Sequence, residues 1–115
     1  EPGEIAKSLA MELRDERFMV LVVMGTARID NRKFKDTFEC KAKMLSFENT
    51  LEVTGHPVGG VCPFGLPAGV EVFLDESLKK YETVFPAAGT GNSAVEFTPQ
   101  ELAEVTGGKW VDVTK

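Results

Sequence analysis

Two runs of apolar residues lie close together near the start of the chain. Residues 9–13 and 18–24 are separated by four charged residues at 14–17, which is typical of a β-hairpin with a four-residue turn. The second run scarcely alternates between apolar and polar positions, and this predicts a central strand that is covered on both faces. Gly25 ends that strand.

The segment that follows has helical spacing. Phe34 and Phe38 lie four residues apart and share the buried face of a helix predicted over residues 32–38. Asp30 or Asn31 can cap the start of this helix, because a short polar side chain accepts hydrogen bonds from the first free backbone N–H groups.

The second half of the chain predicts further short elements. Residues 70–74 alternate well enough to form a strand, after which Asp75 can cap a short helix that runs through Lys80. Residues 83–85 and 93–97 flank a turn of small residues, which predicts a second hairpin.

Residues 98–101 predict the start of a helix. Thr98 is a capping residue, Pro99 suits the first helical position, and Glu101 stands at the third, as in a capping box. The predicted helix presents Leu102 and Val105 to the core. It ends at a glycine that can adopt a left-handed conformation, Gly107.

Strand pairs interspersed with short helices predict an α+β domain with a mixed or antiparallel sheet. Residues 110–113 are expected to form its last strand. The chain has 115 residues, enough for one hydrophobic core with little surplus. We therefore expect a single domain over residues 1–115.

Charge and composition narrow the function classes. A net charge of -5 argues against a large basic face, so the chain is not expected to bind DNA or to bind RNA tightly without specificity. The longest apolar run is too short to cross a membrane. Two cysteines and the lack of a visible signal peptide favour the cytoplasm.

A local excess of basic residues lies between positions 28 and 43. It is interpreted either as a solvated helix face or as a weak contact for a polyanion. Its members are Arg28, Arg32, Lys33, Lys35, Lys41 and Lys43.

Residues 55–65 are the most distinctive stretch of the sequence. A helix predicted from Ser46 ends at Gly55, and the following loop holds four glycines and two prolines. Glycines allow a ligand to approach backbone N–H groups closely, and prolines stiffen the flanks. An ordinary connection between a helix and a strand can have the same composition.

Few side chains offer catalytic chemistry. His56 is the only histidine, and its spacing to the cysteines fits no usual zinc site, so we expect no metal. Cys62 and His56 could form a nucleophile pair, or Cys62 could serve as a small apolar side chain and His56 as a substrate-shaping one. Lys7 either reaches solvent along an apolar wall or directs its ammonium beneath the glycine loop.

Three blocks carry a resemblance to a known family. Residues 5–9, 55–65 and 93–102, with the closing residues 107–113, resemble the YbaK/EbsC family. These proteins are freestanding relatives of the editing domain inserted in bacterial prolyl-tRNA synthetases. The resemblance implies that family's barrel-like sheet with short helices around it. It also implies an additional N-terminal stretch before the lysine block, which is absent from this sequence.

The resemblance implies hydrolysis of the ester between an amino acid and the 3′-terminal adenosine of a mischarged tRNA. Lys7 falls on the family's functional lysine, and Gly59 with Pro63 supplies its GxxxP loop. No cofactor is implied; the tRNA 3′ end is the expected partner, together with a prolyl-tRNA synthetase or another synthetase. His56 and Cys62 depart from the usual family residues, which leaves the edited amino acid open.

A mechanism without a protein nucleophile fits this inventory, because an aminoacyl ester is already activated. Backbone N–H groups of Gly59, Gly60 and Val61 would stabilise the oxyanion while Lys7 holds the substrate. The residues expected around the amino acid are His56, Cys62, Pro63, Gly89 and Asn92. Two alternatives stay open: a non-catalytic module that binds an aminoacyl group, a nucleotide or a synthetase, and a cysteine hydrolase using Cys62.

Overall fold

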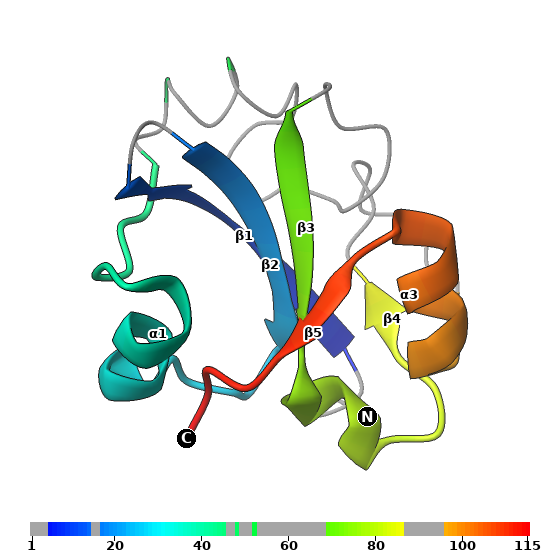
Figure 1. Cartoon of the computed structure of the whole chain (residues 1–115). Helices are drawn as coiled ribbons and strands as arrows, with labels where there is room; N and C mark the ends of the chain where they lie inside the picture. Colours follow the sequence, from blue (N-terminus) through cyan, green and yellow to red (C-terminus); the bar gives the residue numbers. More distant parts are fainter. Residues whose placement is uncertain (1–4, 15–16, 46–47, 49–51, 53–68, 87–95) are drawn as a thin grey trace.

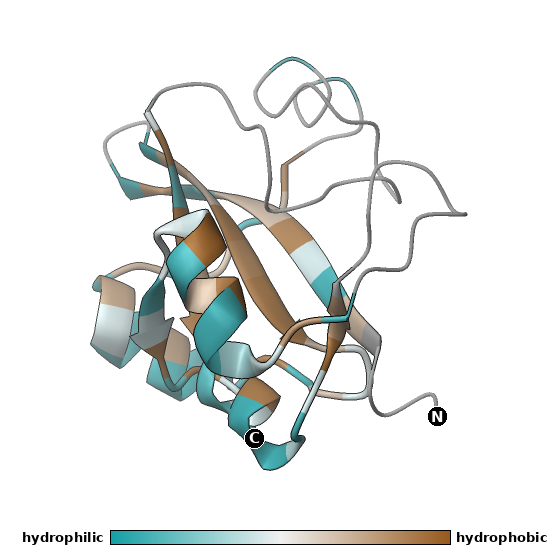
Figure 2. Cartoon of the chain, turned by 90° about the vertical axis from the view of Figure 1, so that its right-hand side faces the viewer, coloured by the Kyte–Doolittle hydropathy of each residue, from teal (hydrophilic) through white to brown (hydrophobic). Residues whose placement is uncertain are grey.

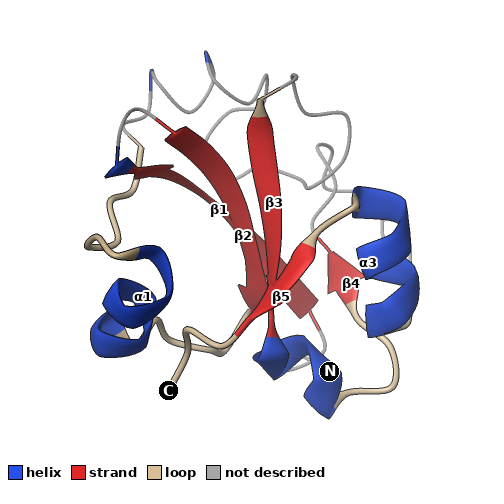
Figure 3. Ribbon diagram, viewed as in Figure 1, coloured by secondary structure: helices blue, strands red, loops and turns tan. Residues whose placement is uncertain are grey.

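A five-stranded sheet forms the centre of the molecule. The computed structural model describes residues 5–14, 17–45, 48, 52, 69–86 and 96–115, and within them the strand order is β4-β1-β2-β3-β5 (Figure 1). The strands are β1 (Ile5–Leu13), β2 (Arg17–Met24), β3 (Val70–Asp75), β4 (Phe85–Pro86) and β5 (Lys109–Val111). The helices are α1 (Asn31–Phe38), the 3-10 helix η3 (Glu76–Lys80) and α3 (Pro99–Thr106) (Figure 3).

The predicted first hairpin is confirmed, with two corrections to its bounds: β1 begins at Ile5 and not at Leu9, and Arg17 already belongs to β2, so three residues and not four separate the strands. Strands β1 and β2 pair antiparallel from Ala6 opposite Met24 to Leu13 opposite Arg17. The remaining pairs, β1 with β4, β2 with β3 and β3 with β5, are parallel. The sheet is therefore mixed, and the α+β class predicted from the sequence is confirmed.

Strand β2 is covered on both faces, as its unbroken apolar run predicts. Residues 19–24 are at most 2% exposed. Because side chains alternate along a strand, Val20 and Val22 enter one hydrophobic cluster while Met19 and Leu21 enter the other. The strand thus separates two cores.

One helix closes each core. Phe34 of α1 joins the cluster that contains Leu21, and Leu102 of α3 joins the cluster that contains Val20. Helices α1 and α3 lie on opposite sides of the strands in Figure 1, and the hydropathy colouring of Figure 2 shows mainly apolar residues along the central strands and a mixture of polar and apolar residues along the helices. Phe34 and Leu102 are fully buried, and each such side chain stabilises the fold by roughly 1.5–3 kcal/mol.

The helix caps follow the sequence. Asp30 caps α1 by accepting hydrogen bonds from the backbone N–H groups of Arg32 and Lys33 at 3.0 and 3.1 Å. Thr98 caps α3, where Glu101 N–H donates to the Thr98 hydroxyl at 3.1 Å and Thr98 N–H donates to the Glu101 carboxylate at 2.9 Å. The predicted capping box is therefore confirmed.

The two helices end differently. Helix α3 ends at Gly107 with φ 68°, as predicted, whereas α1 ends at Glu39 with φ 61°. A left-handed conformation strains a residue that has a Cβ atom, so Glu39 holds an unfavourable position that glycine would occupy more easily.

Three sequence predictions need correction. Val105 was expected in the core but is 56% exposed, because α3 has turned that position away from the sheet. The last strand spans Lys109–Val111, not residues 110–113. Phe85 pairs parallel with β1, and the second hairpin appears, within the described residues, as a single antiparallel bridge between Val84 and Phe97.

Candidate functional site

Lys7 is the one predicted site residue that lies within the described residues. It sits on β1 opposite Val23 and is half-buried, so its aliphatic stem is partly covered, as expected. Its ammonium group donates a hydrogen bond to the carbonyl oxygen of Ala27 at 3.0 Å. Ala27 follows the end of β2, and this contact fixes the Lys7 ammonium beside the turn that leads to α1.

Ser8 projects from the opposite face of β1. Ala6 and Ala10 lie on the same face of β1 as Ser8, and they belong to the core that α3 closes. Leu9 lies on the same face as Lys7 and packs against the core that α1 closes. The Ser8 hydroxyl oxygen is buried and has no hydrogen-bond partner in the part of the chain that the structure describes.

The remaining predicted site residues lie outside the described residues. The glycine-rich loop and the turn of small residues both belong to this group, so their placement relative to Lys7 stays a prediction. The residues concerned are His56, Gly59, Gly60, Val61, Cys62, Pro63, Gly89 and Asn92.

A buried carboxylate ties the sheet to the C-terminal segment. Asp75 is fully buried, and its carboxylate accepts hydrogen bonds from Ser77 N–H at 2.8 Å, Val113 N–H at 2.8 Å and the Thr114 hydroxyl at 2.7 Å. The Ser77 hydroxyl in turn accepts from Met24 N–H at 3.3 Å. Asp75 therefore joins β2, β3 and the segment after β5.

These hydrogen bonds decide the ionisation of Asp75. Burial raises the pKa of Asp75. The hydrogen bonds from Ser77, Val113 and Thr114 favour the charged form, and together they lower the pKa by more than burial raises it, so that it lies below the ordinary value of 3.8. The sequence predicted a helix cap at Asp75, which is confirmed. Its partners 38 and 39 residues away were missed, since no local pattern signals them.

The basic residues between positions 28 and 43 are partly used in surface contacts. Lys33 contacts the Asp112 carboxylate at 3.1 Å and the Thr114 carbonyl at 2.9 Å. Lys43 lies 3.4 Å from Glu12. Such contacts between exposed side chains contribute little to stability and fit the interpretation of this region as a solvated face.

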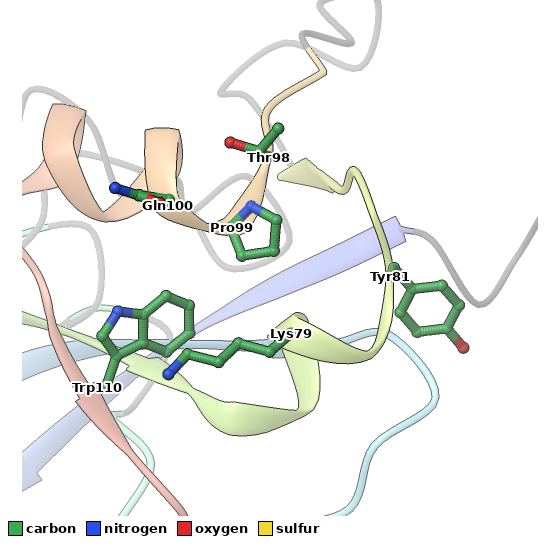
Figure 4. Close-up of a pocket in the computed structure, with 6 residues that line it drawn as sticks. All are labelled: Lys79, Tyr81, Thr98, Pro99, Gln100 and Trp110. Carbon is green, nitrogen blue, oxygen red and sulfur yellow. The ribbon is translucent and has the colours of Figure 1, made fainter.

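A groove that the sequence did not suggest lies between η3, α3 and β5. Its volume is about 680 Å³, and Figure 4 shows the side chains that surround it. They come from the end of η3, the first turn of α3 and the middle of β5. We define the Trp110 groove by these residues: Lys79, Tyr81, Thr98, Pro99, Gln100 and Trp110.

The described ranges hold no candidate metal site and no candidate membrane span. Cys40 is a free, half-buried thiol. Among the described residues no three His, Cys, Asp or Glu side chains are grouped so that they could hold a metal ion. None of the helices in those ranges has the length and apolar character needed to span a bilayer.

Comparison with known proteins decides the family. Residues 1–105 match the sequence profile of the family described as "Aminoacyl-tRNA editing domain". This chain belongs to that family. The membership agrees with the resemblance carried by the lysine block and the glycine loop, and the match ends within α3.

Relatives of this editing domain cover most of its length. The uncharacterised protein YwhH of Bacillus subtilis (strain 168) is 53% identical over 114 residues, which are 98% of this chain and 73% of that protein. The proline–tRNA ligase of Bacillus licheniformis is 30% identical over 79 residues, 68% of this chain and 14% of the ligase.

Solved structures share the fold of the editing domain. A protein described as a candidate trans-editing enzyme for prolyl tRNA synthetase superposes with a TM-score of 0.89 at 31% identity, covering 100% of this chain and 73% of the other. The hypothetical protein APE2540 superposes with a TM-score of 0.89 at 30% identity, covering 100% of this chain and 77% of the other.

Proposed function

We propose that this editing domain hydrolyses the ester that joins a wrong amino acid to the 3′-terminal adenosine of a tRNA. The observation that carries the proposal is the match of residues 1–105 to the aminoacyl-tRNA editing family. The similarity to a candidate trans-editing enzyme for prolyl tRNA synthetase supports an editing role in trans, beside a synthetase.

The reaction needs orientation more than reactive side chains. A water molecule attacks the ester carbonyl, an oxyanion forms, and the ribose hydroxyl leaves as the free amino acid is released. Because the ester is already activated, well-placed hydrogen-bond donors at the oxyanion can supply about 2–4 kcal/mol each toward lowering the barrier. We assign this task to the backbone N–H groups of Gly59, Gly60 and Val61.

Lys7 supplies the charge in this proposal. An ammonium group has three N–H donors, and one of them is directed at the Ala27 carbonyl oxygen 3.0 Å away. Among the described residues this is the hydrogen bond of the Lys7 ammonium, and it orients the group so that its two other N–H donors can serve the terminal phosphate, ribose or ester carbonyl. Ala27 thus positions Lys7 through its backbone carbonyl oxygen, which every substitution at Ala27 keeps.

Amino-acid selection is assigned to residues near the glycine loop and the small-residue turn. His56, Cys62 and Pro63 would border one side of the amino acid, and Gly89 with Asn92 the other. A pocket selects between substrates that differ by one methylene by only about 1–3 kcal/mol. Several small amino acids are therefore expected to be removed at comparable rates.

Net charge sets the mode of tRNA binding. A chain with a net charge of -5 cannot neutralise many phosphates, so the domain is expected to hold only the tip of the tRNA and to bind with modest affinity. A synthetase partner would supply the remaining contacts.

The experiment is a deacylation assay with a panel of mischarged tRNAs. We expect turnover by the unaltered protein, a loss of at least about 100-fold in Lys7→Ala, since two donors to the reacting group are removed, and little change in Lys35→Ala. Lys35 is a matched control because it is an exposed lysine on α1. Gly59→Ala should also abolish turnover without unfolding the domain.

Two outcomes would replace the proposal. Binding of an aminoacyl-tRNA without turnover of any substrate would identify a non-catalytic module. Loss of turnover in Cys62→Ala with full activity in Lys7→Ala would identify a cysteine hydrolase.

A further inference from the structure

The Trp110 groove joins an aromatic ring to a cation. The Lys79 ammonium lies 4.4 Å from the centroid of the Trp110 ring, and Figure 4 shows the two side chains together along one side of the groove, with Pro99 and Gln100 across from them. The ring, the ammonium, an amide and the Thr98 side chain therefore surround one space of about 680 Å³.

The hydrophobic core supports the Trp110 side chain on one side. Trp110 is partly buried and packs against the hydrophobic core that α3 closes, as does Tyr81. Each ring is therefore anchored on one side while another part of it lines the groove. An anchored ring can stack on a planar ligand with little loss of side-chain entropy.

Lys79 is held only loosely. Its side chain is 48% exposed and pairs with Glu76 at 3.1 Å, an exposed pair within η3. Exposed ion pairs and exposed cation–π contacts are both weak. The ammonium can consequently turn from Glu76 toward an anionic ligand at small cost.

The lining favours a ligand that is planar at one end and anionic at the other. Trp110 offers a stacking surface, Gln100 has an amide that can donate to and accept from a base edge, and Lys79 can bind a phosphate. An acidic peptide would use Lys79 alone. A purely apolar ligand would cover the Gln100 amide without giving it a partner, which is unfavourable, and would make no use of the Lys79 ammonium.

We infer that the Trp110 groove binds a single unpaired nucleotide, with its base on Trp110 and its phosphate on Lys79. The inference rests on the proposed function only for the source of that nucleotide, the single-stranded 3′ end of tRNA. Lys7 lies on the same face of β1 as Leu9, which packs against the core that α1 closes, whereas the groove lies beside α3. The groove is therefore a site separate from Lys7.

Trp110 itself reports on the groove, because it is the only tryptophan of the chain. We would titrate the protein with adenosine 5′-monophosphate, adenosine and the trinucleotide CCA while following tryptophan fluorescence. Stacking should give a saturable change with all three. Adenosine should bind about fivefold more weakly than its monophosphate, the effect of one exposed ion pair of about 1 kcal/mol.

Variants separate the two halves of the site. Lys79→Gln should weaken the binding of adenosine 5′-monophosphate about fivefold and leave the affinity for adenosine unchanged. It should also make the slope of log affinity against log salt concentration for CCA shallower by about 0.7. Lys109→Gln is the matched control, since Lys109 is an exposed lysine next to Trp110 that does not line the groove. Its affinities should stay within about twofold of the unaltered protein.

Three results would overturn the inference: no saturable change with any nucleotide, equal weakening by Lys79→Gln and Lys109→Gln, or a saturable response to a glutamate-rich peptide in place of nucleotides. The proposed function fails separately. Lys7-dependent deacylation without nucleotide binding in the groove would refute only the inferred nucleotide site. Nucleotide binding in the groove without deacylation would refute only the proposed deacylase function.

Discussion

Replacing Asp75 with asparagine keeps the size of a buried side chain but removes its charge. In the folded protein one carboxylate oxygen accepts from Ser77 N–H and the Thr114 hydroxyl, and the other accepts from Val113 N–H. Asparagine has a single acceptor oxygen. Its best orientation serves Ser77 and Thr114 and leaves an NH₂ group facing Val113 N–H.

The expected cost follows from these contacts. An unsatisfied buried donor costs about 1–3 kcal/mol, and two bonds that change from charge-assisted to neutral lose roughly half a kcal/mol or more each. We therefore expect Asp75→Asn to lower the free energy of unfolding by about 3 kcal/mol. A domain of this kind is stable by roughly 5–15 kcal/mol, so the variant should still fold.

Urea unfolding followed by circular dichroism measures this effect. Asp112→Asn is the control, because the Asp112 side chain is 60% exposed and pairs with Lys33 at the surface; it should lose about 0.5 kcal/mol or less. A loss below about 1 kcal/mol in Asp75→Asn would show that Asp75 does not join the segments as described.

The pH dependence provides a second check. The folded-state pKa of Asp75 is lowered from 3.8 despite the opposing effect of burial, so its ionised form contributes stability that is present above the unfolded-state pKa. That contribution is lost as the pH falls through the folded-state value. The stability difference between the unaltered protein and Asp75→Asn should be constant near neutral pH and should shrink below 3.8. A difference that does not shrink would contradict the assignment.

Four further substitutions test the fold, each by its urea midpoint. Glu39→Gly should stabilise the protein by about 0.5–1 kcal/mol, because φ 61° is unstrained for glycine; a loss would mean that the Glu39 side chain matters. Gly108→Ala should destabilise it by about 1–3 kcal/mol, because a Cβ would lie 3.0 Å from Leu74 Cγ; no effect would show that β3 can yield. Leu102→Ala should cost about 2–5 kcal/mol and Val105→Ala less than about 0.5, since only the first side chain is buried; equal costs would contradict the orientation of α3.

Local features of the fold were predictable because a few neighbouring residues determine them. The caps at Asp30 and Thr98 depend on side chains that bond within three residues, and the burial of β2 depends on its own composition. Long-range pairing was not predictable in this way. The parallel alignment of β2 with β3 joins Phe18 to Val70, and no local pattern states which strands meet.

The site shows the same division. Lys7 was identified through the lysine block of the family. Its partial burial was expected from a position just before a strand, and the structure places it inside β1, which begins at Ile5. Its hydrogen bond to Ala27, 20 residues away, depends on how the chain leaves β2. The Trp110 groove was not predicted, because its residues come from three elements that lie far apart in the sequence and form no recognisable motif.

The central claim is that the ester is split without a reactive side chain, and one rate comparison tests it most directly. Single-turnover deacylation of a mischarged tRNA should be measured for the His56→Ala/Cys62→Ala double variant and for Lys7→Ala. We expect the double variant to keep its rate within about tenfold, since only pocket shape changes, and Lys7→Ala to lose at least about 100-fold. A double variant as inactive as Lys7→Ala, with its fold intact, would contradict the claim.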